Sequence, residues 1–323
     1  MKIVVADSYL IAHRDRLEAA LPERAAVSWH VPGDSRIVDD LRDAEVFVGS
    51  RFTAEMAAVA DRLRLVHVNG AGTDKIDFDG LGSEVMVANT FNHEQSIAEY
   101  IAGAAVMLRR HLLEQDRALR TGRWASPGYD RTIGQSSSLQ GACVGFVGFG
   151  HIGRSSWNLL RAFGADGAAV TGSGNLDATA EGLRWAAGSG GLDQLMAESE
   201  LVVVCAPLTE QTVGMIGAPQ LGALGASGVL INVGRGPLVV ESALYEALST
   251  GVIAAAAIDV WYRYPDATGY GEPAELPFHT LPNVLMTPHV SGVTANTFAA
   301  RADDIAVNIG RLERGEPLNN LVR

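Results

Sequence analysis

The stretch Val144-Gly-Phe-Val-Gly-Phe-Gly-His-Ile-Gly153 decides the fold of this chain. Its apolar start predicts a buried strand, and glycines at the spacing GxGxxG follow at once in Gly148–Gly153. A helical pattern then runs from about Ile152 to Phe163. In this setting the first glycine permits a tight turn, the second lets a pyrophosphate approach the backbone, and the third lets the helix pack close to the strand. The stretch therefore predicts a dinucleotide site facing a helix N-terminus, whereas an ordinary strand–helix turn is the alternative.

The composition is typical of a globular protein, and the length of 323 residues suggests two domains. A net charge of −12 argues against nucleic acid as a partner, but a few arginines could still hold a small anionic substrate. Cys143 and Cys205 lie in apolar runs, so we expect buried thiols in a reducing cytoplasm, with no disulfide and no metal site. No apolar run approaches the ~18 residues that span a membrane, and the first residues lack the apolar core of a signal peptide.

Short apolar runs alternate with turns and helical patterns, which predicts an α/β fold with parallel sheets. The runs form two series, the first at residues 3–6, 27–31, 46–48, 65–68 and 85–88, and the second at residues 143–147, 168–170, 201–205, 229–232, 255–260 and 284–286.

Between the two series, Ser96-Ile-Ala-Glu99 has the pattern of a capping box, and apolar residues follow it at helical spacing. We expect one long helix there, from about residue 97 to residue 119. The final helical pattern, at about residues 295–314, has no local partner. We expect that helix to pack on the first domain, which would then be discontinuous.

Polar residues stand at the ends of separate strands in the second series. Arg235 follows one strand, Asp259 closes another and His289 follows a third. The carboxyl ends of parallel strands form one crevice in a doubly wound sheet, the same crevice that holds a dinucleotide. Arginine can clamp a carboxylate and polarise a carbonyl, and histidine can move a hydroxyl proton near neutral pH. Taken singly, each residue also has a structural interpretation: a solvated loop arginine, a strand-end cap and a surface histidine.

These residues and several motifs resemble the D-isomer-specific 2-hydroxyacid dehydrogenases. The similarity holds in order and spacing over essentially the whole chain. Its motifs are Asn69-Gly-Ala-Gly-Thr-Asp74, Asn89-Thr90 followed by Ser96-Ile-Ala-Glu99, Gly148–Gly153, Ala206-Pro-Leu-Thr209, Asn232-Val-Gly-Arg-Gly236, Ala257-Ile-Asp-Val260 and Leu281-Pro-Asn-Val-Leu-Met-Thr-Pro-His289.

The resemblance implies two doubly wound parallel-sheet domains. A Rossmann nucleotide domain at residues 98–290 would be inserted in a flavodoxin-like substrate domain made of residues 1–97 and 291–323. It also implies a homodimer and a cleft that closes on binding. Arg235 would clamp the substrate carboxylate and carbonyl, and His289 would be the acid/base.

By the same resemblance, the backbone amides of Ala71 and Gly72 would hold the substrate carboxylate, and Asp259 would contact the nicotinamide. The full set of expected cofactor contacts is Gly148, Gly150, His151, Ile152, Gly153, Thr171, Ser173, Ala206, Pro207, Thr212, Val233, Gly234, Asp259 and Gly292.

The chain departs from the family at Tyr264, where a glutamate usually partners the catalytic histidine. A carboxylate would favour the imidazolium, whereas tyrosine offers a hydrogen bond without charge. We therefore count Tyr264 with the catalytic residues. Glu272 and Glu275 are alternative partners for His289, although solvated loop acids are the other interpretation of both.

A second departure is Thr171, at the position where an aspartate about 20 residues past the glycines would bond the ribose. Without that carboxylate we expect either NAD or NADP to bind, with Thr171, Ser173 and Asn175 as possible partners of a 2′-phosphate. Arg184 is the nearest arginine.

Substrate-binding residues are also expected in two further loops, at Arg51-Phe52 and at His93. Together with Arg263, Arg51 and His93 could add positive charge for a second anionic group. The predicted function is an NAD(P)-dependent oxidoreductase that moves a hydride between nicotinamide and a small 2-hydroxy or 2-oxo acid, or a phosphonate analogue. The alternatives are a formate- or phosphite-type dehydrogenase, an NADH-sensing regulator without catalysis, and an inactive structural subunit.

Overall fold

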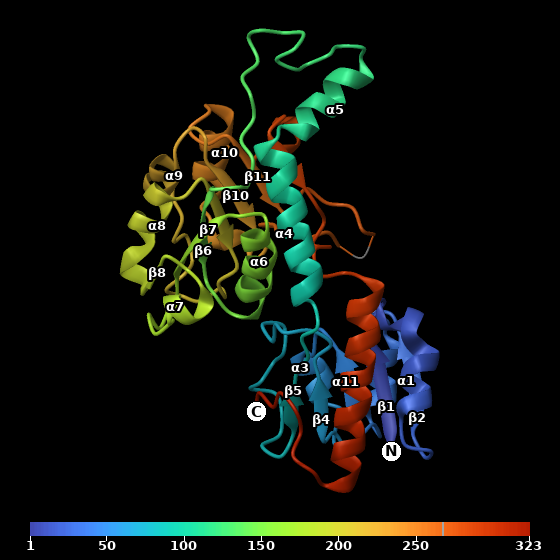
Figure 1. The fold of residues 1–323 in the computed structure, drawn as a ribbon. Coiled ribbons are helices and arrows are strands. Elements are labelled where there is room, and N and C mark those ends of the chain that lie inside the picture. The colour runs from blue at the N-terminus through green and yellow to red at the C-terminus, as the bar shows by residue number, and fades with distance from the viewer. Residues whose placement is uncertain (267) are drawn as a thin grey trace. The chain divides into compact units, whose positions relative to one another are not determined.

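The computed structural model describes residues 1–266 and 268–323, and its chain forms two compact units. The terminal unit consists of Met1–Asn92 and Val293–Arg323, and the central unit consists of His93–Gly292. Each unit is a parallel sheet with helices on both faces (Figure 1). The predicted fold class, two parallel-sheet α/β domains, is confirmed.

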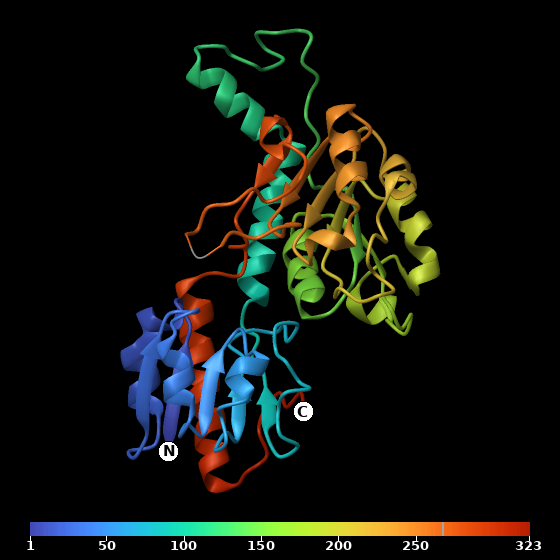
Figure 2. The same ribbon diagram turned by 180° about the vertical axis from the view of Figure 1, so that it is seen from behind.

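The sheet of the terminal unit has the strand order β2-β1-β3-β4-β5, the flavodoxin-like order. Alternate residues of β1 point to opposite faces, so Ile3 and Val5 pack against α11, while Val4 packs on the side of α2. Figure 2, which views the chain from the opposite side to Figure 1, shows α11 running along the sheet. The strands are β1 (Lys2–Ala6), β2 (Ala26–His30), β3 (Val46–Gly49), β4 (Leu65–His67) and β5 (Met86–Ala88), and the helices are η1 (Leu10–His13), α1 (Arg14–Ala20), α2 (Arg36–Leu41), α3 (Ala54–Ala57) and α11 (Ala295–Arg314).

The central unit has a seven-stranded sheet in the order β12-β11-β10-β9-β6-β7-β8. The order in which successive strands are added reverses between β6 and β9, although all strands are parallel, and this is the topological switch point where open α/β sheets bind ligands. The strands are β6 (Cys143–Val147), β7 (Asp166–Val170), β8 (Trp185–Ala187), β9 (Leu201–Val204), β10 (Val229–Asn232), β11 (Ala255–Ile258) and β12 (Val284–Met286).

Helices cover both faces of this sheet because its buried strands are apolar on both sides. One core contains side chains of α4 and α6, and the other contains side chains of α8, α9 and α10. Figure 1 shows the two helix groups on opposite sides of the strands. The helices are α4 (Glu94–Arg109), α5 (Leu112–Arg120), α6 (His151–Ala162), α7 (Ala178–Glu181), η2 (Ser189–Gly191), α8 (Leu192–Glu198), α9 (Ala218–Leu224), η3 (Gly236–Leu238), α10 (Glu241–Ser249) and η4 (Phe278–Thr280).

Two local predictions were wrong. The single helix at residues 97–119 is instead α4 and α5, because His111 adopts a left-handed backbone with φ of +53° and ends the α-helical path. Ser96 does not cap a helix either, because α4 already begins at Glu94, with His93 as its N-cap. The edge strand β8 was missed, since it is short and only half-buried.

Candidate functional site

The glycine turn between β6 and α6 has the geometry that a pyrophosphate site requires. Gly148 has φ of +88°, and a Cβ on it would lie 2.7 Å from the amide nitrogen of Ala206. A Cβ on Gly153 would lie 3.2 Å from the Gly148 carbonyl oxygen, which keeps the helix close to the strand. Gly150 has open space where its Cβ would be, so this side of the backbone is accessible. The turn therefore fits a dinucleotide, with His151 and Ile152 opening the helix that faces its phosphates.

The loop after β7 is built from hydroxyl groups instead of a carboxylate. Thr171 Oγ1 accepts the Gly174 amide hydrogen at 3.1 Å, and Ser173 Oγ accepts that of Asn175 at 3.3 Å. Each hydroxyl accepts through its oxygen and so keeps its own hydrogen to donate to a ribose or a phosphate. Arg184 is ion-paired with Glu198 at 3.0 Å.

The loop that carries Arg235 is shaped by a buried asparagine at the end of β10. Asn232 Oδ1 accepts the Gly234 amide hydrogen at 3.1 Å, and Asn232 Nδ2 donates to the Arg235 carbonyl oxygen at 3.0 Å. A Cβ on Gly236 would lie 2.5 Å from the carbonyl oxygen of Trp261, so the backbone passes close by. Arg235 itself is half-buried, and its Nη1 donates to the Gly234 carbonyl oxygen at 2.8 Å. Asn232 is thus a residue of the candidate site. Its position in the motif Asn-x-Gly indicated this only indirectly.

The turn that carries His289 is anchored by Asp259, which is fully buried. The Asp259 carboxylate accepts hydrogen bonds from Thr287 Oγ1 at 2.7 Å, the Val290 amide at 2.9 Å and the Ser291 amide at 3.0 Å. His289 lies between these donors and has a left-handed backbone with φ of +57°. Asp259 therefore fixes the turn around His289, and its contact with the nicotinamide stays a prediction.

Tyr264 is a neighbour of His289 in the structure. Its Oη lies 3.0 Å from His289 Nδ1, and it also accepts the Trp261 amide hydrogen at 3.4 Å. Glu275, one of the alternative partners, forms an ion pair with Arg263. A phenol hydroxyl can donate to a neutral imidazole or accept from a protonated one, so it can hold either form of the ring.

The other predicted cofactor residues lie on strand ends and loops of the central unit. Thr212 Oγ1 donates to the Pro207 carbonyl oxygen at 2.8 Å, which closes the loop after Ala206. Val233 and Gly234 are buried in the turn after β10. A Cβ on Gly292 would meet the Cβ of His93 at 3.2 Å.

The predicted substrate loops of the terminal unit follow β3 and β4. Phe52 is fully buried and forms an isolated parallel β-bridge with Ile76, whereas Arg51 is exposed. Arg51 lines a surface depression of about 480 Å³ together with Phe52, Thr53, Ala54, Asp74, Lys75, Ile76 and Asp77.

The loop with Ala71 and Gly72 is held by polar groups on each side. Asn89 Nδ2 donates to the Ala71 carbonyl oxygen at 2.9 Å, and the guanidinium of Arg301 would lie 3.7 Å from a Cβ on Gly70. Arg301 on α11 donates from Nε to the Phe91 carbonyl oxygen at 2.8 Å. The sequence does not indicate Arg301 as a neighbour of this loop, because it lies more than 200 positions after Phe91 and belongs to no motif.

The described part of the chain, residues 1–266 and 268–323, holds no candidate metal cluster and no candidate membrane span. It contains no group of three or more His, Cys, Asp or Glu side chains placed to hold a metal ion. None of its helices combines the length and apolar character needed to cross a membrane.

Comparison with known proteins agrees with this geometry. Residues 102–291 match the family described as D-isomer specific 2-hydroxyacid dehydrogenase, NAD binding domain. The chain is 30% identical to glyoxylate/hydroxypyruvate reductase B of Serratia proteamaculans, over 92% of this chain and 89% of that protein. It is 28% identical to D-3-phosphoglycerate dehydrogenase of Methanocaldococcus jannaschii over 88% of its own length, but spans only 53% of that relative.

A solved structure shares the fold over nearly the whole chain. The NADPH-dependent glyoxylate/hydroxypyruvate reductase of Sinorhizobium meliloti, in complex with NADP and malonate, superposes with a TM-score of 0.79 at 28% identity. The match covers 99% of this chain and 96% of that one.

The glycine turn and the sheet order define a dinucleotide-binding domain of the Rossmann class. The chain belongs to the D-isomer-specific 2-hydroxyacid dehydrogenase family. It is an NAD(P)-dependent dehydrogenase that acts on a CH–OH group of its donor.

Proposed function

We propose that the enzyme interconverts a small anionic 2-oxo acid and its 2-hydroxy acid, with Arg235 and His289 acting on the substrate. The supporting observation is that both residues follow strands of one parallel sheet, β10 and β12, at the edge where the glycine turn follows β6. The nicotinamide cofactor, when bound, supplies or accepts the hydride.

Each residue has a role that its chemistry allows. The Arg235 guanidinium would bind the substrate carboxylate and polarise the carbonyl that is reduced. His289 would give a proton to the developing alkoxide in reduction and remove it in oxidation. Tyr264 would hold Nδ1 of His289, which leaves Nε2 as the nitrogen that moves the proton.

For the substrate itself, we propose an acid of the size of glyoxylate or hydroxypyruvate, the compounds in the names of several relatives. On the terminal unit, the amides of Ala71 and Gly72 are the proposed donors to its carboxylate. Arg51 and His93 would favour a substrate with a second anionic group, such as a phosphonate. Arg263 supports this less, because Glu275 already balances its charge.

We expect NADP(H) to be used within about tenfold of NAD(H), since the loop after β7 presents hydroxyls and no carboxylate to the ribose. The ratio of kcat/KM values for the two cofactors measures this. A much larger preference for NAD(H) would contradict the proposed role of Thr171 and Ser173.

The experiment that tests the proposed function is a screen of small 2-oxo and 2-hydroxy acids, phosphonates included, with both cofactors and detection at the nicotinamide absorbance band. Arg235→Ala should bind cofactor as the wild type does, measured by fluorescence quenching, and lose turnover. Cofactor binding without turnover of any acid by the wild-type enzyme would favour an NADH-sensing regulator. Turnover of formate or phosphite instead of 2-hydroxy acids would favour the formate- or phosphite-type alternative.

We also propose that the chain forms a homodimer through the segment after α4. Helix α5 buries none of its residues, and the arm that follows carries an exposed aromatic pair, Trp124 and Tyr129, with ring centroids 5.3 Å apart. Large exposed apolar groups of this kind are typical of association surfaces. Light scattering on the wild type and on a Trp124→Ser, Tyr129→Ser variant tests it, and a monomeric wild type would contradict it.

A further inference from the structure

A chain of hydrogen bonds ties the His289 turn to helix α4. Tyr100, in the second turn of α4, has its Oη 2.8 Å from Thr287 Oγ1. Thr287 Oγ1 lies 2.7 Å from Oδ1 of Asp259, the carboxylate that accepts the two amide hydrogens directly after His289. All of these groups belong to the central unit.

The donors in this chain can be assigned from their chemistry. An ionised carboxylate only accepts, so the Thr287 hydroxyl gives its single hydrogen to Asp259. The Thr287 oxygen then accepts, and the phenol of Tyr100 must be the donor. Burial raises the pKa of Tyr100 to about 12, so this phenol keeps its hydrogen at neutral pH. Hydrogen bonds that run in one direction strengthen one another.

Thr287 also holds the turn through its backbone. Its carbonyl oxygen accepts the His289 amide hydrogen at 3.1 Å and the indole hydrogen of Trp261 at 2.8 Å. The turn needs such support, because His289 has a left-handed backbone that residues with a Cβ rarely adopt.

We infer that Tyr100 is a positioning residue for His289, which it fixes through Thr287 and Asp259. The inference rests on the proposed function, in which His289 moves the substrate proton. Without the phenol, the Thr287 hydroxyl loses its donor and the turn is held less firmly. The imidazole then spends less time in the reactive orientation, which lowers kcat more than it weakens binding.

Tyr100→Phe tests this, with Tyr262→Phe as the matched control. Tyr262 is also half-buried, and its phenol donates at 3.0 Å to the Val239 carbonyl oxygen, which is not part of the His289 turn. With glyoxylate or hydroxypyruvate and NADPH, we expect kcat of Tyr100→Phe to fall about five- to tenfold. KM and the NADPH Kd should change by less than about twofold, and Tyr262→Phe should keep the wild-type kcat.

Two variants at Thr287 test whether Tyr100 acts on the His289 turn through the Thr287 hydroxyl. Thr287→Ser keeps the hydroxyl and should retain the wild-type kcat, whereas Thr287→Val also removes the hydrogen bond to Asp259 and should lose at least as much as Tyr100→Phe. The double variant of Tyr100→Phe and Thr287→Val should be no slower than Thr287→Val alone, because Tyr100 acts only through the Thr287 hydroxyl.

A second readout does not depend on turnover. The imidazole NMR signal of His289, assigned by its loss in His289→Gln, should shift and change its pH midpoint in Tyr100→Phe but not in Tyr262→Phe. An unchanged signal with an unchanged kcat would overturn the inference, and so would equal losses in both tyrosine variants. If the wild type turns over no 2-oxo acid, the proposed function fails, and the NMR comparison alone decides the positioning role.

Discussion

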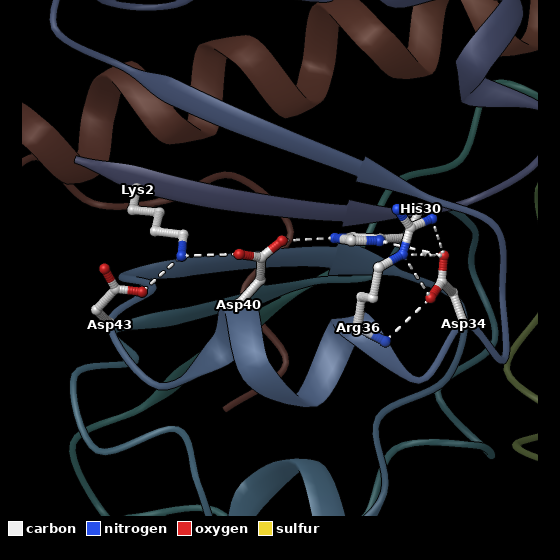
Figure 3. A network of polar contacts seen from close by, with 6 residues as sticks. All are labelled: Lys2, His30, Asp34, Arg36, Asp40 and Asp43. Atoms are coloured by element: carbon white, nitrogen blue, oxygen red, sulfur yellow. Dashed lines mark hydrogen bonds and ion pairs between the residues drawn. The ribbon is translucent and has the colours of Figure 1, made fainter.

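Two histidines of this chain have opposite kinds of partner. His30, buried in the terminal unit, has Nε2 2.8 Å from Asp40 Oδ2 and Nδ1 3.5 Å from Asp34 Oδ2. Lys2 and Arg36 pair with these two carboxylates and extend the contacts into one polar network (Figure 3). His289, exposed in the central unit, has the phenol of Tyr264 at 3.0 Å instead.

The difference separates a structural histidine from the histidine that we propose as the acid/base. The Asp40 carboxylate on helix α2 holds the His30 imidazole at the end of strand β2, which suits a permanent link between the two elements. A phenol fixes the ring as well, but adds no charge, so His289 can exchange a proton at lower cost in either direction. Three substitutions test this contrast. One removes His289, one places a carboxylate beside His289, and one removes a carboxylate from beside His30.

The largest effect is expected from His289→Ala. If His289 is the general acid/base, its loss should lower kcat by about 10²–10⁴-fold with a 2-oxo acid substrate. The measurement is the steady-state rate with each cofactor. His279→Ala, which removes another exposed histidine of the central unit, is the control and should keep the wild-type rate. A near-normal rate in His289→Ala would favour the formate-type mechanism, in which the donor has no hydroxyl proton to remove.

Tyr264→Glu makes the surroundings of His289 more like those of His30. We expect its effect to be smaller than that of His289→Ala and larger than that of a substitution beside His30. The new carboxylate favours the imidazolium and raises the pKa of His289, by about one pH unit. Reduction needs the protonated ring, so its activity should persist to higher pH. Oxidation needs the neutral ring, so it should begin at higher pH.

The pH dependence of kcat/KM in both directions measures this shift. Tyr270→Glu adds the same charge at another exposed tyrosine and should leave both midpoints in place. Equal midpoints in wild type and Tyr264→Glu would mean that residue 264 does not contact His289 in the working enzyme.

The sequence was sufficient for features that depend on local patterns. The glycine turn at Gly148–Gly153, the strands around it and the helix Ala295–Arg314 follow from glycine spacing and apolar periodicity. The break at His111 does not follow from such patterns, because the apolar periodicity of the sequence continues through it. Arg109, at the end of α4, folds back to the Ser138 carbonyl oxygen and to Glu200. Such contacts override the helical preference of the local sequence.

The features of the candidate site divide in the same way, into those that local patterns indicate and those that depend on remote contacts. Arg235, His289 and Tyr264 could be proposed as site residues because each stands in or beside a recognisable motif. The hydrogen bonds around His289 could not be predicted, since their partners are remote: Tyr100 and Thr287 are separated by 187 positions, and Asp259 bonds amides more than 30 residues further on. No pattern along the chain reports a hydrogen bond of that kind.

The smallest effect is expected from Asp40→Asn, which takes a charged partner away from His30. Burial alone would raise the pKa of Asp40, but hydrogen bonds from Lys2 and His30 outweigh it and lower the pKa below its usual value. A carboxyl group with a lowered pKa stabilises the fold above its ordinary pKa, and this contribution is lost as the pH falls. At pH 7 the variant should therefore unfold more easily, by about 1 kcal/mol.

Calorimetry at pH 7 and near pH 3 measures this, and the difference in Tm between wild type and Asp40→Asn should shrink at the lower pH. Asp39→Asn is the matched control, because Asp39 lies next in sequence on α2 and is exposed, 3.9 Å from Arg42. Surface ion pairs of that kind contribute little, so its Tm should stay close to that of the wild type. Equal losses in the two variants would show that the carboxylates around His30 act only through the general charge of α2. The contrast with His289 would then rest on Tyr264 alone.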